Sequence, residues 1–463
     1  MRIIYRIKQF ILMGGDLAAF LLALGLSLTI RHFQLPIWQS IEYNAAIFSI
    51  VFLLWLTVNY INGLYDLSKQ ANDRKFYRRF VEVAIMSLVI SVIFFYLVTG
   101  TRISPKTILL LNIIFGYSLS ALWRFLYNKF VGSKKLVTKV VMVGSTRETP
   151  EIIDTLQKHP KKGYKIIAFI DPDHTIRSDE YPDLDIYHGL HTIRPVISTR
   201  SAQLVVIAPQ LQKNSEALRE LYELLFWDVN ITDTPTFYEI ITGRITPTVF
   251  SEGWFLEHLK NSDQPIYNKF RILMDFSAGL IFALFFVILF PLVALAIKIN
   301  SKGPIFFKQK RVGKNGLVFT MYKFRSMYAL STDGSAEIDG FQFAKKNDKR
   351  ITVTGKFLRK TRLDELPQCL NLLKRDITLI GPRPERPEIT KKLEEKMPYY
   401  PLRHTVRPGL TGWAVIHQSY TDTLEDSLQK LQYDLYYIKN RSALLDLSIL
   451  LRTVNVVVRM MGQ

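Results

Sequence analysis

The sequence predicts a membrane α-helical bundle of four spans, then an α/β domain, then an α-rich α/β domain with a bent membrane helix. Three observations support this fold class. Four apolar runs gather in the first 130 residues, strand and helix patterns alternate from Lys134 onward, and a fifth apolar run with Pro291 precedes a basic C-terminal region. We expect a transmembrane region at 1–130, an α/β domain at 131–250, a linker at 251–267 and a C-terminal domain at 268–463.

The four N-terminal runs are each long enough to cross a bilayer, which takes about 17 to 25 residues. They cover 10–30, 45–61, 80–98 and 107–123. Three more runs follow the first one and no small-residue cleavage site closes it, so it is an anchor and not a signal peptide. Asp16 and Glu82 lie in or beside these runs, and we interpret them as solvated or paired near an interface and not as transport residues.

Basic residues indicate the orientation of the bundle. One side has only Arg31, Arg102 and Lys106, and the other side has a larger set: Arg2, Arg6, Lys8, Lys69, Arg74, Lys75, Arg78 and Arg79. The positive-inside rule therefore places the N-terminus, and everything after residue 130, in the cytoplasm.

The overall composition limits the function further. The 463 residues carry 60 Lys and Arg against 40 Asp and Glu, and the formal charge of +20 favours anionic partners. Cys369 is the single cysteine, which excludes an intrachain disulfide and suits a reducing compartment. Both features argue against a secreted soluble enzyme.

The middle region alternates strands and helices in the pattern of a parallel sheet. Strands are expected at 137–143, 165–170, 203–208 and 229–232, with helices at 149–159 and 215–226. Gly144 follows the first strand where a dinucleotide-binding loop would begin, but Thr146 and Thr149 replace the other two glycines. Asp171 ends the second strand near the position of a ribose-binding acid. Nucleotide binding and a structural or regulatory role both stay open.

The fifth apolar run, 276–297, has 22 residues without a charge, or about 33 Å of helix. A full crossing would put the basic segment 298–325 outside the cell, against the positive-inside rule. Pro291 removes a backbone hydrogen bond within the run. We therefore expect a re-entrant helix at 270–299 that breaks at Pro291, with a proline-kinked span as the alternative.

The C-terminal region holds the candidate site. From Lys260 onward there are 33 Lys and Arg against 18 Asp and Glu. The adjacent acids Asp364 and Glu365 follow Arg359 and could do different work around one metal ion or phosphate. Cations beside glycine- and proline-rich turns are candidate phosphate ligands: Lys308, Arg311, Lys323, Arg325, Arg383 and Arg386.

No other chemistry competes with this site. The sequence has no complete P-loop, no zinc-type cluster and no Gly-x-Ser-x-Gly elbow. His404 and His417 are interpreted as structural. Nucleic acid is not an expected partner because the charge clusters beside membrane segments. The tail at 444–461 is expected to be an interfacial helix or a buried core helix.

The C-terminal motifs resemble those of the bacterial polyprenyl-phosphate hexose-1-phosphate transferases, the large monotopic phosphoglycosyl transferases that begin exopolysaccharide and capsule synthesis. The resemblance runs from Asn268 to the C-terminus and rests on the segments FKQKRVG at 307–313, YKFRSM at 322–327, LDELPQ at 363–368 and GPRP at 381–384. It also implies that the middle domain is Rossmann-like.

The resemblance implies transfer of a hexose 1-phosphate from a UDP-sugar, with UDP-glucose favoured, to undecaprenyl phosphate. Asp364 would be the nucleophile, and Glu365 would assist Mg²⁺ binding or proton transfer. Lys323, Arg359 and Arg383 would neutralise phosphate charge, and Pro291 would mark the re-entrant break. The expected partners are undecaprenyl phosphate, the UDP-sugar and membrane lipids, in a bacterial inner membrane, with a homo-oligomer left open.

Two segments depart from the family pattern. Arg375-Asp376-Ile377-Thr378 stands where Gly-Asp-Met-Ser is common, and Val415 and Ser419 replace a usual Gln and Arg. These changes concern the donor site and the identity of the sugar. The alternative to the enzyme is a non-catalytic membrane scaffold or regulator of polysaccharide export.

Overall fold

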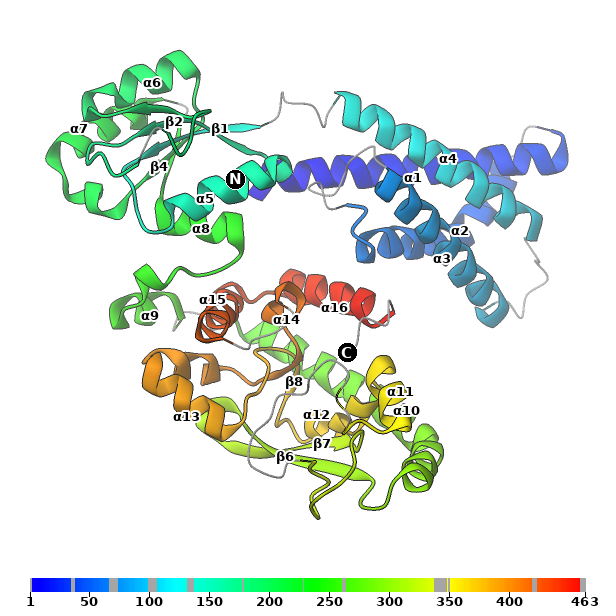
Figure 1. Ribbon diagram of the computed structural model, residues 1–463. Coiled ribbons are helices and arrows are strands. Elements are labelled where there is room, and N and C mark those ends of the chain that lie inside the picture. The colour runs from blue at the N-terminus through cyan, green and yellow to red at the C-terminus, as the bar shows by residue number, and fades with distance from the viewer. Residues whose placement is uncertain are drawn as a thin grey trace. The chain divides into compact units, whose positions relative to one another are not determined.

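A computed structural model of the chain describes residues 2–34, 38–65, 74–98, 106–130, 137–176, 179–227, 229–259, 264–336, 348, 350–418 and 423–458 (Figure 1). The chain divides into two compact units, Met1–Phe237 and Tyr238–Gln463. The division falls before the boundary at 250 that the sequence suggests, because residues after Tyr238 pack with the C-terminal unit. Glu239, for example, pairs with Lys439 at 2.7 Å.

The N-terminal part of the first unit is a bundle of four long helices, as predicted. They are α1 (Arg2–His32), α2 (Trp38–Ile61), α3 (Arg74–Val98) and α4 (Lys106–Phe130). Among the described residues, four helices are long and apolar enough to cross a membrane: Ile7–His32, Asn44–Ile61, Thr107–Asn128 and Pro265–Asn300. The third predicted run forms α3, which begins with a basic turn and is not among these four.

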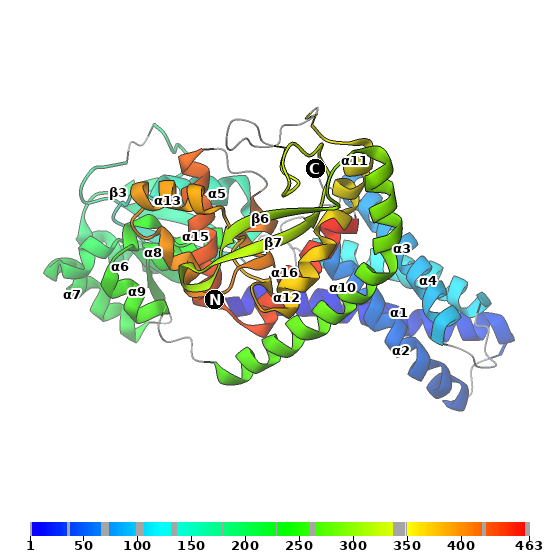
Figure 2. The ribbon, with the colours of Figure 1, turned by 90° about the horizontal axis from the view of Figure 1, so that it is seen from below.

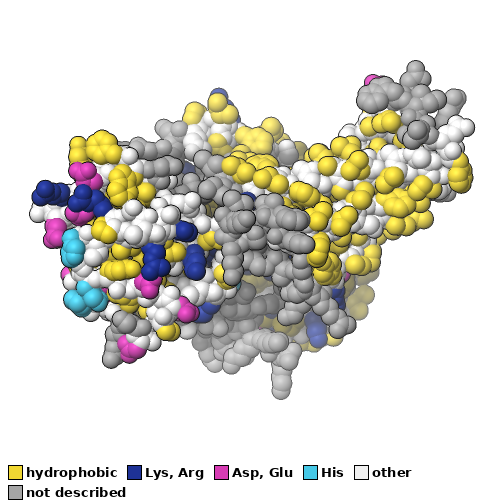
Figure 3. Space-filling model, turned by 90° about the horizontal axis from the view of Figure 1, so that it is seen from above, with side chains coloured by type: hydrophobic (Ala, Val, Ile, Leu, Met, Phe, Trp, Pro, Cys, Tyr) yellow, Lys and Arg dark blue, Asp and Glu magenta, His cyan; other side chains and the backbone are white. Residues whose placement is uncertain are grey.

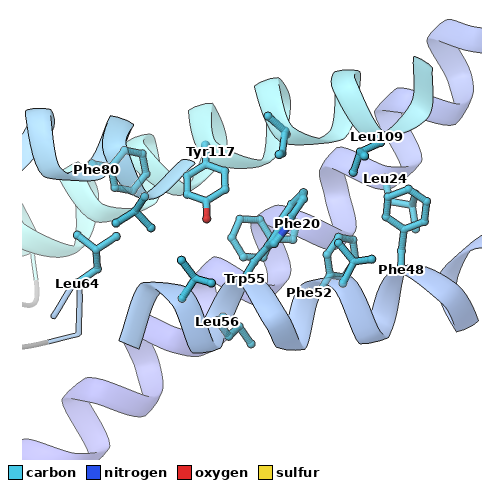
Figure 4. Packing of buried hydrophobic residues seen from close by; sticks show 14 of the residues in the cluster. Phe20, Leu24, Phe48, Phe52, Trp55, Leu56, Leu64, Phe80, Leu109 and Tyr117 are labelled. Atoms are coloured by element: carbon cyan, nitrogen blue, oxygen red, sulfur yellow. The ribbon is translucent and has the colours of Figure 1, made fainter. Parts of the chain in front are cut away.

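Aromatic side chains fill the centre of the bundle (Figure 4). The ring of Phe20 lies 5.0 Å from that of Trp55 and 5.5 Å from that of Tyr117. Such edge and tilted contacts stabilise a core beyond simple burial. The outer surface of the bundle is also hydrophobic (Figure 3). A bundle that is apolar both inside and outside suits a lipid environment.

Asp16 is paired, as one of the predicted interpretations holds, but it is buried and not solvated. It forms an ion pair with Arg124, and both side chains are at most 1% exposed. Its two oxygens also accept hydrogen bonds from Ser120 Oγ at 2.7 Å and Tyr65 OH at 2.8 Å. Glu82 pairs with Arg78 one helical turn away, at 3.1 Å. Both acids therefore have structural partners within the bundle.

The rest of the first unit is a five-stranded parallel sheet in the order β3-β2-β1-β4-β5. Its strands are β1 (Thr138–Val143), β2 (Tyr164–Ile170), β3 (Asp185–Tyr187), β4 (Leu204–Ile207) and β5 (Asn230–Asp233). Its helices are α5 (Thr149–Lys158), α6 (Ile193–Arg200), α7 (Ser215–Glu223) and α8 (Thr234–Thr242), the last of which crosses into the second unit. The predicted alternation is confirmed, and β3 and α6 are additional elements.

The two residues that suggested nucleotide binding both have structural uses. Gly144 has a φ of +78°, and a Cβ there would lie 2.6 Å from Leu211, so glycine is required for packing. The Asp171 carboxylate accepts hydrogen bonds from Thr175 Oγ1 at 3.0 Å and from the Ile176 backbone N–H at 2.7 Å. These contacts favour the structural or regulatory interpretation of this domain.

The second unit combines short strands with many helices. Its helices are α9 (Glu252–Leu259), α10 (Pro265–Asn300), α11 (Val353–Thr361), α12 (Cys369–Leu373), α13 (Pro387–Lys396), α14 (Trp413–His417), α15 (Leu424–Asn440) and α16 (Ala443–Val458). Its strands are β6 (Phe306–Val312), β7 (Val318–Phe324), β8 (Thr378–Ile380) and β9 (Gly409–Thr411). The first two form an antiparallel hairpin, and the last two pair in parallel.

Helix α10 is the long apolar helix of this unit, and it is bent (Figure 2). It remains helical through Pro291, so the break predicted there is not present, and the bend lies within one continuous helix (Figure 2). Phe286 and Phe290 pack against Phe306 and Phe324 of the hairpin, with ring centroids 5.8 Å apart in two of the pairs. Large apolar residues on its other face are exposed, such as Val287 at 67%. The helix therefore has one face for the protein and one for an apolar medium.

The C-terminal helix α16 combines the two alternatives that the sequence left open, because one side is buried like a core helix and the other is exposed like an interfacial helix. Ile449 and Asp446 are buried against the unit, and Thr453 Oγ1 lies 2.7 Å from Thr411 Oγ1 of β9. Leu444 and Leu447 on the other side are exposed. Residues 459–461 of the predicted tail lie outside the described residues.

Candidate active site

Three elements of the second unit meet at the candidate site. The first is strand β7, the second is a 3₁₀ helix, η9 (Leu363–Gln368), and the third is the loop 381–386 between β8 and α13. The predicted acids Asp364 and Glu365 both lie at the start of η9. Arg362, just before them, takes a left-handed backbone conformation with a φ of +59°, which turns the chain from α11 into η9.

Glu365 is the centre of a cluster of cations. Lys323 Nζ donates a 3.0 Å hydrogen bond to its Oε1, and guanidinium nitrogens of Arg383 and Arg362 lie 3.4 and 3.8 Å from the same oxygen. Burial alone raises the pKa of the Glu365 carboxyl, but Lys323, Arg383 and Arg362 together hold that pKa well below its ordinary value. Glu365 is therefore a fixed anion that orients three cations.

The Asp364 carboxyl group has a different environment from that of Glu365. Its side chain is buried, and its Oδ1 has no hydrogen-bond partner. Burial and, after it, the neighbouring charge of Glu365 raise the pKa of the Asp364 carboxyl, against the opposing charges of Lys323 and Arg359. A buried carboxylate oxygen without a partner is costly, so its lone pairs are available to a ligand or to a reaction.

The hairpin separates two of the predicted phosphate ligands. Lys323 lies opposite Phe307 in the register, and Lys308 lies opposite Tyr322. Because neighbouring residues of a strand point to opposite faces, Lys308 lies on the face away from Lys323. Lys308 is also exposed. Phosphate binding by Lys308 stays a prediction that this geometry does not support.

Arg325 is also engaged elsewhere. It is 2% exposed, and its guanidinium donates to the backbone oxygens of Ser301, at 2.8 Å, and Lys302, just after α10. These are carbonyls at the end of a helix, which commonly need a donor. Arg325 therefore fixes the end of α10 against β7, and its predicted phosphate contact has no support here.

The other predicted cations lie around the site. Arg359 donates from Nε to Ser326 Oγ at 2.9 Å, and its charge acts on Asp364. Arg311 donates to the Pro384 carbonyl at 3.0 Å, and Arg386 occupies the N-cap position of α13 without a side-chain capping hydrogen bond. Within the proline-rich loop, the Arg383 guanidinium reaches Glu365.

A buried ion network supports this loop, and the sequence analysis missed it. Glu385 forms ion pairs with Lys430 and, at 3.7 Å, with Arg311. Arg403 donates to the backbone carbonyl of Arg383 at 2.8 Å and lies 2.8 Å from Asp434, although that contact is not aligned as a hydrogen bond. Glu385 directly follows the GPRP motif. Asp434 and Lys430 lie on α15, and no sequence signal linked them to the loop.

The residues at the first departure from the family pattern are mainly structural. Asp376 accepts a 2.9 Å hydrogen bond from Asn371, whose side chain also holds Tyr322 and Thr320 of β7. Thr378 Oγ1 donates to Asp275 of α10 at 2.6 Å. Val415 lies half-buried in α14, and Ser419 lies outside the described residues.

The carboxylates of the site offer few ligands for a metal ion. Among the described residues there is no group of three or more His, Cys, Asp and Glu side chains that could hold a metal ion. Glu365 already binds three cations, and the unpartnered oxygen belongs to Asp364. Mg²⁺ commonly binds through one or two carboxylates together with substrate phosphates. The residues therefore fit an ion that arrives with a diphosphate.

Comparison with known proteins identifies a family model described as bacterial sugar transferase, which matches residues 266–460. The UDP-N-acetylgalactosamine-undecaprenyl-phosphate N-acetylgalactosaminephosphotransferase of Aeromonas hydrophila is 40% identical over 224 residues, which are 48% of this chain and 51% of that protein. This chain therefore spans about half the length of that relative.

Two further relatives are matched over more of the chain. A UDP-glucose:undecaprenyl-phosphate glucose-1-phosphate transferase of Klebsiella pneumoniae is 30% identical over 68% of this chain and 67% of its own length. A protein of the same name from Xanthomonas campestris pv. campestris is 29% identical over 71% of this chain and 67% of its own. The matched region of the family model covers α10 from its second residue and every element of the candidate site.

Proposed function

This chain belongs to the bacterial sugar transferase family, and we propose that it transfers a hexose 1-phosphate from a UDP-sugar to undecaprenyl phosphate, as the first membrane step of exopolysaccharide or capsule synthesis. UDP-glucose is the proposed donor, because several relatives are named for it. The Aeromonas relative, named for the N-acetylgalactosamine donor, makes that sugar the first alternative.

One observation carries this proposal. Asp364 has a buried oxygen without a partner, next to an acid that fixes Lys323, Arg383 and Arg362 around it. The arrangement suits a carboxylate nucleophile that faces a diphosphate, because the cations are already in place to receive its negative charge.

In the proposed reaction Asp364 attacks the phosphorus that bears the sugar. A bond forms between its carboxylate oxygen and that phosphorus, the bond from the same phosphorus to the bridging oxygen breaks, and UMP leaves with the bridging oxygen. An oxygen of undecaprenyl phosphate then attacks the same phosphorus and releases Asp364. The product is undecaprenyl-diphosphate-sugar, and Lys323 and Arg383 balance the charge on the phosphate oxygens in both steps.

We further propose that Mg²⁺ binds with the donor through Asp364, with Glu365 close by. When bound, the ion would neutralise diphosphate charge. The protein's own residues do the rest: Asp364 attacks, Glu365 holds the cations, and burial excludes bulk water from the carboxylate.

The placement of α10 supports a re-entrant helix in the inner membrane, with the catalytic unit on the cytoplasmic side. Tyr267 near its start donates to Asp446 at 2.7 Å, and Asn300 at its end accepts from the Thr354 backbone N–H at 3.3 Å. Both ends thus contact the same unit, which supports a helix that enters and leaves the membrane by one face. In a Cys369→Ser background, the cysteines of Ile266→Cys and Lys302→Cys should both react with a thiol reagent added on the cytoplasmic side only.

The decisive experiment measures UMP release by the purified full chain, with undecaprenyl phosphate, Mg²⁺ and a panel of UDP-sugars. We expect release that depends on the lipid and is lost by at least about 10⁴-fold in Asp364→Asn. Glu388→Gln, at an exposed acid of α13, is the matched control and should retain activity.

Two outcomes distinguish the alternatives. Release with UDP-N-acetylgalactosamine in place of UDP-glucose would change the donor and leave the reaction intact. A folded protein that releases no UMP from any UDP-sugar would reject the transferase and favour a scaffold. The covalent step has its own test: donor labelled in the sugar phosphate should leave label on the protein when lipid is omitted, and Asp364→Asn should carry none.

A further inference from the structure

We propose that Arg375 and Arg407 form a binding site for the phosphate group of a membrane lipid beside α10. The proposal goes beyond the transferase reaction, because neither arginine belongs to the cluster around Asp364 and Glu365. Both residues lie in the described part of the second unit, one just before each strand of the small parallel sheet.

The pairing of β8 with β9 brings the two arginines to the same edge. Thr378 lies opposite Gly409 in the register, and its backbone N–H donates to Pro408 at 2.9 Å. Arg375 precedes Thr378 by three residues and Arg407 precedes Gly409 by two, so both stand at the amino-terminal end of the sheet. In agreement with this, burial lowers the pKa of the Arg407 guanidinium, and the nearby charge of Arg375 lowers it further.

The cations at this edge are not balanced by the protein. Neither Arg375 nor Arg407 has a side-chain hydrogen bond or ion pair with the residues that the structure describes. Asp275 on α10 is the nearby acid, but its two oxygens already accept from Thr378 Oγ1 and the Leu379 N–H. Arg271, also nearby, donates to the Ile380 carbonyl. The two remaining guanidinium groups leave a net positive charge that an anion would relieve.

The backbone at Arg375 strengthens the argument. Its φ of +64° is a left-handed conformation that favours glycine and is unfavourable for a long side chain. The side chain is exposed, so packing does not explain the choice of residue. An arginine at a strained, exposed position is consistent with use of its guanidinium group.

The position of the pair selects the ligand. Asp275 ties this edge of the sheet to α10, next to exposed apolar residues of that helix, Ile272, Leu273 and Phe276. A lipid that touches this apolar face would present its headgroup phosphate close to the pair. Planar guanidinium groups match phosphate oxygens in a bidentate manner, and basic groups beside a membrane surface attract anionic lipids.

The test is lipid binding to the full chain by native mass spectrometry, with dioleoylphosphatidylglycerol, dioleoylphosphatidylcholine and undecaprenyl phosphate as separate probes. Arg375→Gly removes the side chain and also relieves the backbone, so the variant should fold. It and Arg407→Gln should each lower binding of a phosphate-bearing anionic lipid about fivefold. Lys391→Ala, an exposed cation of α13, is the control and should bind as the parent chain does.

The probes separate the two sources of the phosphate. If the variants bind less phosphatidylglycerol, the ligand is a membrane phospholipid. If they bind less undecaprenyl phosphate alone, the ligand is the acceptor lipid. Either result supports the site. Unchanged binding of both lipids in both variants overturns the proposal. The readout does not depend on UMP release, so the site can fail while the transferase stands, or stand while the transferase fails.

Discussion

Lys323 Nζ lies 3.0 Å from Oε1 of Glu365, whereas Oδ1 of Asp364, one residue earlier in the same 3₁₀ helix, has no partner. Two adjacent carboxylates therefore have opposite environments. The Asp364 carboxyl is buried and has a raised pKa, whereas the Glu365 carboxylate is stabilised as an anion by the cations around it. Such a division is what the proposed reaction needs, in which Asp364 attacks phosphorus and Glu365 positions the cations.

The two lysines of the hairpin provide a direct test of this geometry. Lys323→Met should lower kcat/KM for the UDP-sugar by about 10²- to 10³-fold, because it removes a cation placed for the developing phosphate charge. Lys308→Met changes the same type of residue on the opposite face, and its kcat/KM should stay within about threefold of the parent value. Equal losses in both variants would show that both faces of the hairpin serve the substrate.

The pH dependence of single-turnover UMP release should report the raised pKa of Asp364. The attacking group must be ionised, so the rate should fall on the acid side at a pH above that of an ordinary aspartate, whose pKa is about 3.9. Glu365→Gln removes a charge that raises this pKa and frees cations that lower it. The acid limb of the variant should therefore move to lower pH, and a limb that stays in place or moves upward would contradict the assignment.

Elements with a strong periodic or apolar pattern could be predicted from the sequence. The first strand, expected at 137–143, is β1 (Thr138–Val143), and all four expected N-terminal helices are present. The short elements were harder, since β3 has three residues and η9 six, too few to show a period. A bend in α10 was expected because a proline disturbs a helix locally, but the helix continues through Pro291 without the expected break.

The site was only partly predictable for a different reason. Asp364 and Glu365 are adjacent in sequence, so their motif was visible. Which cations face them depends on strand register and helix ends, and these assign Lys323 to the site and Arg325 to the carbonyls after α10. The Arg403 and Asp434 pair joins segments 31 residues apart, and no local pattern marks it.

Asp434→Asn should destabilise the catalytic unit by about 3 to 5 kcal/mol, because Arg403 would stay buried without its counter-ion. Unfolding can be followed by the reaction of the buried thiol of Cys369 with a fluorescent reagent, since the chain has no other cysteine. The pair also supports the loop of a proposed phosphate ligand, because Arg403 donates to the backbone carbonyl of Arg383.

The double variant Arg403→Met with Asp434→Leu separates these two roles. It should regain much of the lost stability, because replacing a buried ion pair with apolar residues is often tolerated. Its KM for the UDP-sugar should remain raised, because the loop that carries Arg383 has lost its support. A double variant with both stability and KM restored would make the pair purely structural.

Gly355→Ala should destabilise the unit at the junction of α11 and β7. A Cβ at this position would lie 1.9 Å from the carbonyl oxygen of Ser326, so the start of α11 must shift. Overpacking of this kind costs about 1 to 3 kcal/mol. Gly253→Ala in α9 meets no atom within 4 Å and should be neutral or slightly stabilising, and a similar loss in both variants would contradict the close approach.

His404 should make the catalytic unit sensitive to acid. Burial, followed by the charge of Arg403, lowers its pKa from 6.5 to about 4. The unfolded chain therefore binds a proton more readily than the folded one between these values, so the stability from neutral His404 is present above pH 6.5 and is lost as pH falls towards 4. His404→Phe removes this group, and the thiol-reactivity midpoint of Cys369 should vary less with pH across that window than in the parent chain. An unchanged slope would mean that other buried groups, such as Glu385 with its pKa of about 2, dominate the acid response.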